Sequence, residues 1–168
     1  ACEAEHSVPT FSFRFSEKEK AGTFYPEKAN SLGIPKGELW HKLQQGEEII
    51  VEGKSIKPSE VMGPNVPGKK IGISGDTRPT KKLEEFFKNC DHLVFDSTFS
   101  DDLKEKAVKT YHSTAKEAAT FAKNTSVSNL ILTHFSARYK DENVLLNEAK
   151  SVHDSVMAAK DQLKVEIE

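Results

Sequence analysis

Apolar residues follow two different periods along the chain. Phenylalanine occupies every second position from 11 to 15, which is the period of a half-buried strand. After Gly68, short apolar runs predict strands at 70–74, 92–95, 129–132 and 163–167. Helical spacing predicts helices at 79–89, 101–109, 114–123 and 141–160. Strands that alternate with helices predict an α/β fold, in which a layered sheet carries helices on at least one face.

Residues 21–69 interrupt this regular pattern, because Gly, Pro, Lys and Glu dominate there. The segment contains a short amphipathic stretch at 37–45, a hairpin-like piece at 49–56 and a brief helix that begins at Pro58. Its periodic apolar residues are too few to predict a substantial core. We therefore expect an inserted arm at 21–69 within one domain that spans 1–168.

Three predicted strands end in residues that can bind metals. Asp76 follows the first strand after the insertion, Asp96 follows the second and His134 follows the third. In β-α sheets, functional groups gather at the carboxyl ends of strands, and imidazole and carboxylate are common ligands of Zn²⁺. The same residues also have an ordinary structural interpretation, as turn or cap residues and as a packed histidine. Spacing alone does not distinguish the two.

The other histidines carry weaker signals. His112 precedes a helix whose Thr114 and Glu117 form a capping box, where free amides can hold an anion such as phosphate, but an ordinary histidine before a cap fits equally well. His6 is uninformative by itself. We assign the remaining histidines to surface or packing roles: His41, His92 and His153.

Composition narrows the function classes. The net charge of −2 and the pI near 6.4 argue against a generic nucleic-acid binder, so any contacts with RNA must be local, and we expect no DNA partner. Apolar runs are too short to span a membrane, and the start has no signal-peptide pattern. These observations predict a cytoplasmic protein without a membrane partner.

Five short motifs, in their order and spacing, resemble the C-terminal motifs of the ribonuclease Z family, which trims the 3′ ends of precursor tRNA. They are Glu-His-Ser-Val-Pro at 5–9, Gly-Asp-Thr-Arg-Pro at 75–79, Asp-Ser-Thr-Phe at 96–99, His-Ser-Thr-Ala at 112–115 and Thr-His-Phe-Ser-Ala-Arg-Tyr at 133–139. The Gly-Ile-Pro-Lys-Gly segment at 33–37 resembles the flexible arm of the same family. The resemblance covers essentially the whole chain.

The resemblance implies the C-terminal part of a metallo-β-lactamase αββα sandwich with an inserted flexible arm. It also implies two zinc ions that activate a water for attack on a phosphodiester. His6 would bind one zinc, His134 would bind the other, and Asp76 would bridge them, since two neighbouring dications need shared negative charge. Asp96 would orient His112, and the imidazole would protonate the departing 3′ oxygen.

Substrate contacts are implied as well. Arg138 would contact phosphate near the cut, and Lys36 and Lys42 in the arm would contact the tRNA elbow. The family commonly forms homodimers, so we expect one here. Glu38 stands where the family arm often carries proline, which is unfavourable beside RNA.

One departure from the family pattern is larger. The family's His-x-His-x-Asp-His cluster does not occur among the 168 residues, which begin at Ala1 close to His6. We therefore expect a fragment that binds zinc poorly and cleaves little by itself. Two other functions stay open: a non-catalytic tRNA-binding or assembly module, and a metallo-β-lactamase relative that hydrolyses a small ester.

Overall fold

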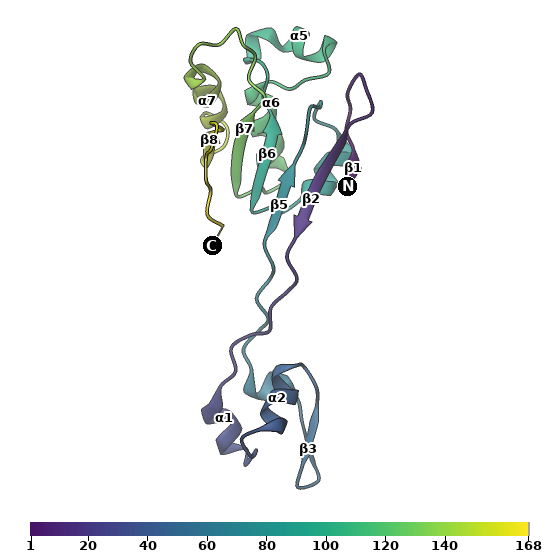
Figure 1. The fold of residues 1–168 in the computed structure, drawn as a ribbon, viewed down its shortest axis with the longest axis vertical. Coiled ribbons are helices and arrows are strands. Elements are labelled where there is room, and N and C mark those ends of the chain that lie inside the picture. Colours follow the sequence, from purple (N-terminus) through teal and green to yellow (C-terminus); the bar gives the residue numbers. More distant parts are fainter. Residues whose placement is uncertain (168) are drawn as a thin grey trace. The chain divides into compact units, whose positions relative to one another are not determined.

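The computed structural model describes residues 1–167, which form two compact units. The first unit joins Ala1–Ser16 to the chain from Lys69 onward, and the second is Glu17–Gly68. Figure 1 shows that each unit has its own sheet and helices. The second unit overlaps the segment 21–69, where the sequence analysis expects an inserted arm.

The first unit contains a six-stranded sheet in the order β1-β2-β5-β6-β7-β8. The strands are β1 (Cys2–Glu3), β2 (Phe11–Ser16), β5 (Lys70–Ile73), β6 (His92–Asp96), β7 (Asn129–Thr133) and β8 (Val156–Ala158). The pairs β1–β2 and β2–β5 are antiparallel, whereas β5 through β8 run parallel. The parallel strands therefore have their carboxyl ends at one edge of the sheet.

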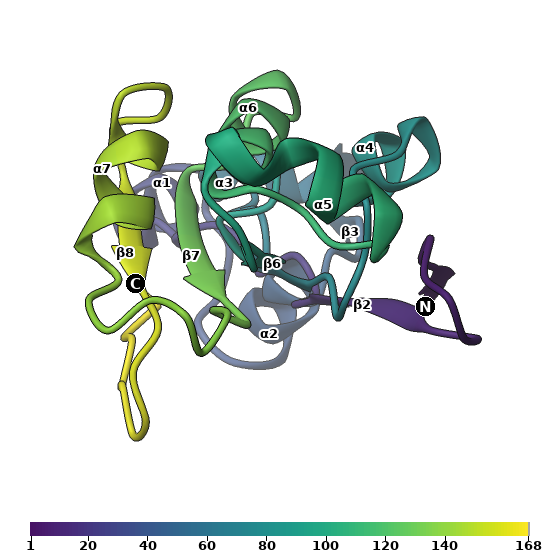
Figure 2. The ribbon, with the colours of Figure 1, turned by 90° about the horizontal axis from the view of Figure 1, so that it is seen from above.

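Helices cover one face of this sheet (Figure 2). They are α4 (Lys81–Phe87), α6 (Ala115–Asn124) and α7 (Asn143–Lys150). The 3-10 helix η1 (Asp101–Leu103) and α5 (Lys104–Lys109) follow β6, and α5 lies beyond the carboxyl ends of the strands (Figure 1). The longest, α6, begins with the expected capping box, in which Thr114 and Glu117 each bond the other's backbone N–H. Its Phe121 packs against Phe87 and Phe95 in the buried core.

The opposite face of the sheet carries a continuous apolar row. Strand register places five side chains side by side, one from each of β2, β5, β6, β7 and β8: Phe13, Ile73, Val94, Ile131 and Met157. The strand expected at 11–15 is confirmed as β2, but its phenylalanines are about half exposed while Ser12 is buried. The helix-covered side of β2 is thus the polar side, and Ser12 Oγ donates to Ser74 O there at 2.6 Å.

The C-terminal secondary structure differs from the prediction. The helix expected over 141–160 was wrong beyond Lys150, because α7 ends there and β8 follows. β8 adds to the sheet beside β7 and buries Val156 opposite Leu130. The stabilisation from this strand pairing and burial is greater than the local preference of these residues for a helix. The closing strand expected at 163–167 does not form.

The second unit builds a small core from short elements. These are α1 (Pro26–Ser31), α2 (Glu38–Gln44), β3 (Ile49–Val51), β4 (Lys54–Ile56) and α3 (Pro58–Val61). Its buried residues are Ala29, Ile34, Leu43, Ile49, Ile56 and Val61. We expected no substantial core here; the structure corrects this, because apolar residues too sparse to show a period still converge from five elements. Trp40 Nε1 donates to Ile34 O at 3.0 Å and ties the unit together.

Through residue 167, the structure contains no helix long and apolar enough to cross a membrane.

Candidate metal and proton-transfer site

The carboxyl ends of the parallel strands position three of the candidate residues. Gly75 turns the chain after β5 with a φ of 63°, which glycine adopts without steric cost, and Asp76 follows it. Asp96 is the last residue of β6. His134 follows β7 directly and holds a φ of 63°, a conformation that is uncommon for a residue other than glycine.

These residues meet His6 and His112 at one place. His134 Nε2 lies 3.4 Å from Asp76 Oδ2. The ring of His112 stacks on that of His134 with centroids 4.8 Å apart, and the centroid of His6 lies 5.0 Å from that of His112. One ligand atom from each of His6, Asp76 and His112 lies within 4.8 Å of the others, and the same holds for Asp96, His112 and His134.

The N-terminal segment reaches the site through two contacts. Glu5 N donates to Thr77 Oγ1 at 3.0 Å, and Arg78 N donates to Glu5 O at 3.1 Å. Next to them, His6 Nδ1 lies 3.1 Å from Tyr111 O. His6 is therefore held beside the loops that carry Asp76 and His112, although the sequence separates it from them by many residues.

Asp96 is the buried centre of the hydrogen-bond network. Its side chain is fully buried, and its carboxylate accepts four hydrogen bonds. Thr77 N and His112 Nδ1 bond Oδ2 at 3.0 and 2.8 Å, while the amide and hydroxyl of Thr98 bond Oδ1 at 3.1 and 2.7 Å. A buried carboxylate requires such partners, and here both oxygens are fully used.

The network fixes the tautomers of the three imidazoles. A carbonyl oxygen only accepts, so His6 Nδ1 donates its proton to Tyr111 O. His112 Nδ1 likewise donates to the Asp96 carboxylate. The Thr98 hydroxyl gives its single proton to Asp96 and therefore accepts from His134 Nδ1, 2.8 Å away. In each neutral ring Nε2 is left as the unprotonated nitrogen, which is the form that binds metals.

This donor set fits a divalent metal ion. Asp76 and His134 are partly exposed, with side-chain exposures of 38% and 45%, so an ion could reach them from solvent. Imidazole nitrogens together with a carboxylate suit zinc and similar ions. Each cluster found among residues 1–167 contains three such residues and includes His112, one fewer than a four-coordinate structural site uses.

None of the three expected substrate-binding residues belongs to either three-residue cluster. Arg138 is exposed, its Nε donates to Ser136 Oγ at 3.0 Å, and its guanidinium lies 5.1 Å from the centre of the Phe99 ring. Lys36 and Lys42 belong to the second unit. Lys42 Nζ lies 2.9 Å from a carboxylate oxygen of Glu38.

Sequence reasoning missed two groups at the site. Thr98, within the 96–99 motif, links Asp96 to His134. Arg78, within the 75–79 motif, donates from Nη1 to His112 O at 2.5 Å. Their presence in the motifs was a signal, but the partner atoms are contributed by distant parts of the chain.

Comparison with known proteins supports a common origin with one superfamily. A family model described as the beta-lactamase superfamily domain matches residues 42–135. The crystal structure of the metallo-beta-lactamase fold protein YhfI from Bacillus subtilis superimposes with a TM-score of 0.58 at 18% identity, covering 94% of this chain and 45% of that one. At that identity the likeness shows the fold, and the expected fold class is confirmed.

Curated relatives are more similar in sequence. Ribonuclease Z from Nitrosopumilus maritimus is 64% identical over 99% of this chain and 56% of its own length. Ribonuclease Z from Methanosarcina acetivorans is 42% identical over 99% of this chain and 55% of its own length. The chain thus spans about half the length of the curated relatives it matches.

Proposed function

The chain belongs to the beta-lactamase superfamily, and from its likeness to ribonuclease Z relatives we propose that it forms the C-terminal part of an endoribonuclease that removes 3′ trailers from precursor tRNA. The observation that carries the proposal is the meeting of Asp76, His134 and His6 beside the Asp96–His112 pair. Hydrolysis of a phosphodiester needs an activated water and a proton for the leaving oxygen, and these two groups of residues suit the two tasks.

Metal binding is the first task. His6, His134 and Asp76 would hold divalent ions, which we propose to be zinc, and the Asp76 carboxylate would supply negative charge to the site. Bound there, the metal would supply Lewis-acid activation of water and neutralise charge on the phosphate. The neighbouring residues prepare this site, since Thr98 and Tyr111 O hold the Nδ1 protons of His134 and His6 and leave each Nε2 available.

Proton transfer is the second task. The Asp96 carboxylate accepts a hydrogen bond from His112 Nδ1–H at 2.8 Å and stabilises the imidazole ring when the ring is positively charged. A proton held at His112 Nε2 can then pass to the departing 3′ oxygen. His112 is only partly buried, with 15% of its side chain exposed, so a substrate oxygen can approach it.

Substrate binding is assigned to exposed cations. We propose that Arg138 contacts phosphate near the cut, and that the second unit acts as a tRNA-binding arm through Lys36 and Lys42. The Glu38–Lys42 pair opposes this contact, because the carboxylate competes with phosphate for the ammonium group.

Glu38→Gln should therefore strengthen tRNA binding about two- to threefold at low salt, measured by filter binding. Unchanged or weaker binding of tRNA by Glu38→Gln would mean that Lys42 does not contact tRNA.

The main test supplies the part of the relatives that this chain does not span. The chain is incubated with a 3′-extended tRNA precursor and Zn²⁺ or Mn²⁺, with and without the N-terminal portion of the Nitrosopumilus maritimus relative. We expect cleavage at the trailer in the mixture and loss of cleavage with Asp76→Asn. Asp101→Asn is the matched control, because Asp101 forms a partly exposed ion pair with Lys116 and belongs to neither three-residue cluster. A metal-loaded mixture that binds the precursor but never cuts it would contradict the proposal and favour a non-catalytic tRNA-binding module.

A second test separates proton transfer from metal binding. His112→Ala in the complemented enzyme should slow cleavage by about 10²- to 10⁴-fold, the usual contribution of a general acid. Its zinc content should equal that of the parent by elemental analysis. A loss of zinc would make His112 a metal ligand, as its place in both three-residue clusters allows.

Assembly and location complete the proposal. We propose a homodimer that acts in the cytoplasm on RNA and not on DNA; the names of the ribonuclease Z relatives support RNA as the substrate. Analytical ultracentrifugation of the complemented enzyme tests the dimer.

A further inference from the structure

Arg78 and Glu117 form a nearly buried ion pair behind the site. Their side chains are 13% and 12% exposed. The guanidinium donates to both carboxylate oxygens, from Nη1 to Oε2 at 2.7 Å and from Nη2 to Oε1 at 2.5 Å. Glu117 Oε2 also accepts from Thr114 N at 3.0 Å, so the pair is anchored to the first turn of α6. Such a two-point pair holds a guanidinium in one orientation.

The same guanidinium holds the segment that carries His112. Arg78 Nη1 donates to His112 O at 2.5 Å, and the adjoining Ser113 Oγ donates to Thr77 O at 2.6 Å. The residue before His112, Tyr111, has a φ of 59° and closes the C-terminus of α5, where His112 N donates to Ala107 O at 2.9 Å and Tyr111 N to Val108 O at 3.3 Å. The α5 terminus thus holds the amide of His112, and the contacts from the 77–78 loop hold its carbonyl and the residue that follows.

Arg78 also reaches the segment that carries His6. Its backbone N–H donates to Glu5 O at 3.1 Å, next to His6. His6 in turn bonds the carbonyl of Tyr111. One residue thus connects the loop after β5, the N-terminal segment and the loop before α6, and all three carry candidate site residues.

We propose that the Arg78–Glu117 pair is a positioning pair for His112. It does not touch the reacting atoms; it holds the His112 backbone so that Nδ1 stays on Asp96 and Nε2 stays directed at the leaving oxygen. The proposal deepens the proposed function and rests on it for its kinetic consequence. Small displacements of a catalytic group cost large factors in rate, so a positioning pair should affect kcat more than KM.

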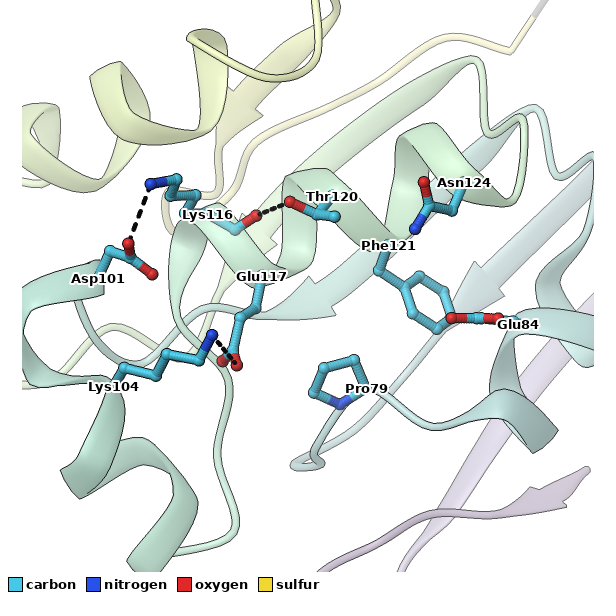
Figure 3. Close-up of a pocket in the computed structure, with 9 residues that line it drawn as sticks. All are labelled: Pro79, Glu84, Asp101, Lys104, Lys116, Glu117, Thr120, Phe121 and Asn124. Atoms are coloured by element: carbon cyan, nitrogen blue, oxygen red, sulfur yellow. Dashed lines mark hydrogen bonds and ion pairs between the residues drawn. The ribbon is translucent and has the colours of Figure 1, made fainter.

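The opposite side of the pair offers a matched control. Glu117 lines a pocket of about 350 Å³, with Lys104, Lys116, Asp101 and Pro79 among its other lining residues (Figure 3). From this side Lys104 Nζ lies 3.7 Å from Glu117 Oε1 and is 59% exposed. Lys104→Met removes a charge beside Glu117 and leaves the contact between Arg78 and His112 O in place.

Replacing both members of the pair separates positioning from folding. Removing one partner leaves a charge buried and can unfold the protein, whereas an apolar replacement of both is often tolerated. The test variant is therefore Arg78→Met/Glu117→Leu, compared with the parent and with Lys104→Met. Amide spectra and thermal melts confirm that each variant is folded.

Two readouts follow in parallel. In the chain itself, two-bond ¹H–¹⁵N spectra report which ring nitrogen of His112 is protonated; we expect the Nδ1–H form in the parent and Lys104→Met, and a mixture of both forms in the double variant. In the complemented enzyme, the double variant should lower kcat about 10- to 100-fold with KM within about threefold, while Lys104→Met stays within about twofold.

The results distinguish the two proposals. A folded double variant that keeps the parent's ring spectrum and its kcat overturns the positioning role, and so does an Nε2–H form of His112 in the parent. If the complemented parent does not cleave, the proposed function fails, and the ring spectra still decide whether the pair positions His112.

Discussion

Replacing Asp96 by asparagine tests the central carboxylate with almost no change in size. Two donors, Thr77 N and His112 Nδ1, face Oδ2, and the amide and hydroxyl of Thr98 face Oδ1. Whichever way the asparagine amide turns, its NH₂ group meets a backbone N–H, that of Thr77 or Thr98, which can only donate. The His112 ring and the Thr98 hydroxyl can instead accept from the NH₂ group. Each hydrogen bond to a charged group is worth about 1.5–3 kcal/mol, so the loss of at least one should cost no less than about 1.5–3 kcal/mol. A domain is typically stable by about 5–15 kcal/mol, which makes this a large effect.

The assay must report on the unit that contains Asp96. The single tryptophan, Trp40, lies in the Glu17–Gly68 unit, so its fluorescence follows the other unit. Native-state exchange of the β6 and β7 amides gives the free energy of unfolding locally. Asp101→Asn is again the control, and its exposed pair with Lys116 should be worth at most about 1 kcal/mol. If Asp96→Asn cost no more than this control, the four-donor network would be wrong.

Three further predictions concern packing, pH and metal content. Gly72→Ala should lower stability by about 1–3 kcal/mol by thermal melting followed by circular dichroism, because its Cβ would lie 2.6 Å from Phe87 Cδ1 and 2.7 Å from Leu93 Cδ1 in a filled core. Burial, the largest influence, favours the neutral form of Glu117, but the hydrogen bond from Arg78 and other favourable contacts outweigh it and hold its pKa below the ordinary value. A lowered carboxyl pKa stabilises the fold above the unfolded pKa, and this stability is lost as pH falls through the folded pKa. The melting temperature of Glu117→Gln should therefore fall less steeply than that of the parent when the pH is lowered, in the same assay. Elemental analysis of the dialysed chain should find fewer than two tightly bound zinc ions per molecule, because both metal-capable clusters contain three residues and share one imidazole; two tight ions would refute this.

Local sequence signals predicted the regular part of the fold well. Strands at 70–74, 92–95 and 129–132 correspond to β5, β6 and β7, and the capping box at 114–117 starts α6. These elements depend on nearby residues, so their patterns are visible in sequence. The failure over 141–160 has a different cause. β8 exists because β7 offers an open edge, and a helical period cannot reveal a partner supplied by another strand.

Site residues that directly follow a strand could be predicted from the sequence. Site residues that act through hydrogen bonds to residues far away in the sequence could not. Asp76, Asp96 and His134 each follow an apolar run, so their common edge could be expected. The role of Arg78 could not be expected in the same way. Its side chain meets Glu117 and a backbone carbonyl in the segment before α6, and a carbonyl carries no residue signature in the sequence.

The direction of the hydrogen bonds explains why all three neutral imidazoles carry their proton on Nδ1. Asp96 and the carbonyl of Tyr111 accept and cannot donate in return, so they set the protons of His112 and His6 without ambiguity. The Thr98 hydroxyl donates its proton to Asp96, so it can only accept from His134 Nδ1, and this fixes the proton of His134 on Nδ1. Two acceptors thus determine three tautomers, and Nε2 carries no proton in each neutral ring; that of His134 faces Asp76 Oδ2 at 3.4 Å. A histidine motif by itself specifies only that rings are present; the acceptors behind the rings decide which nitrogen a metal or a substrate oxygen meets.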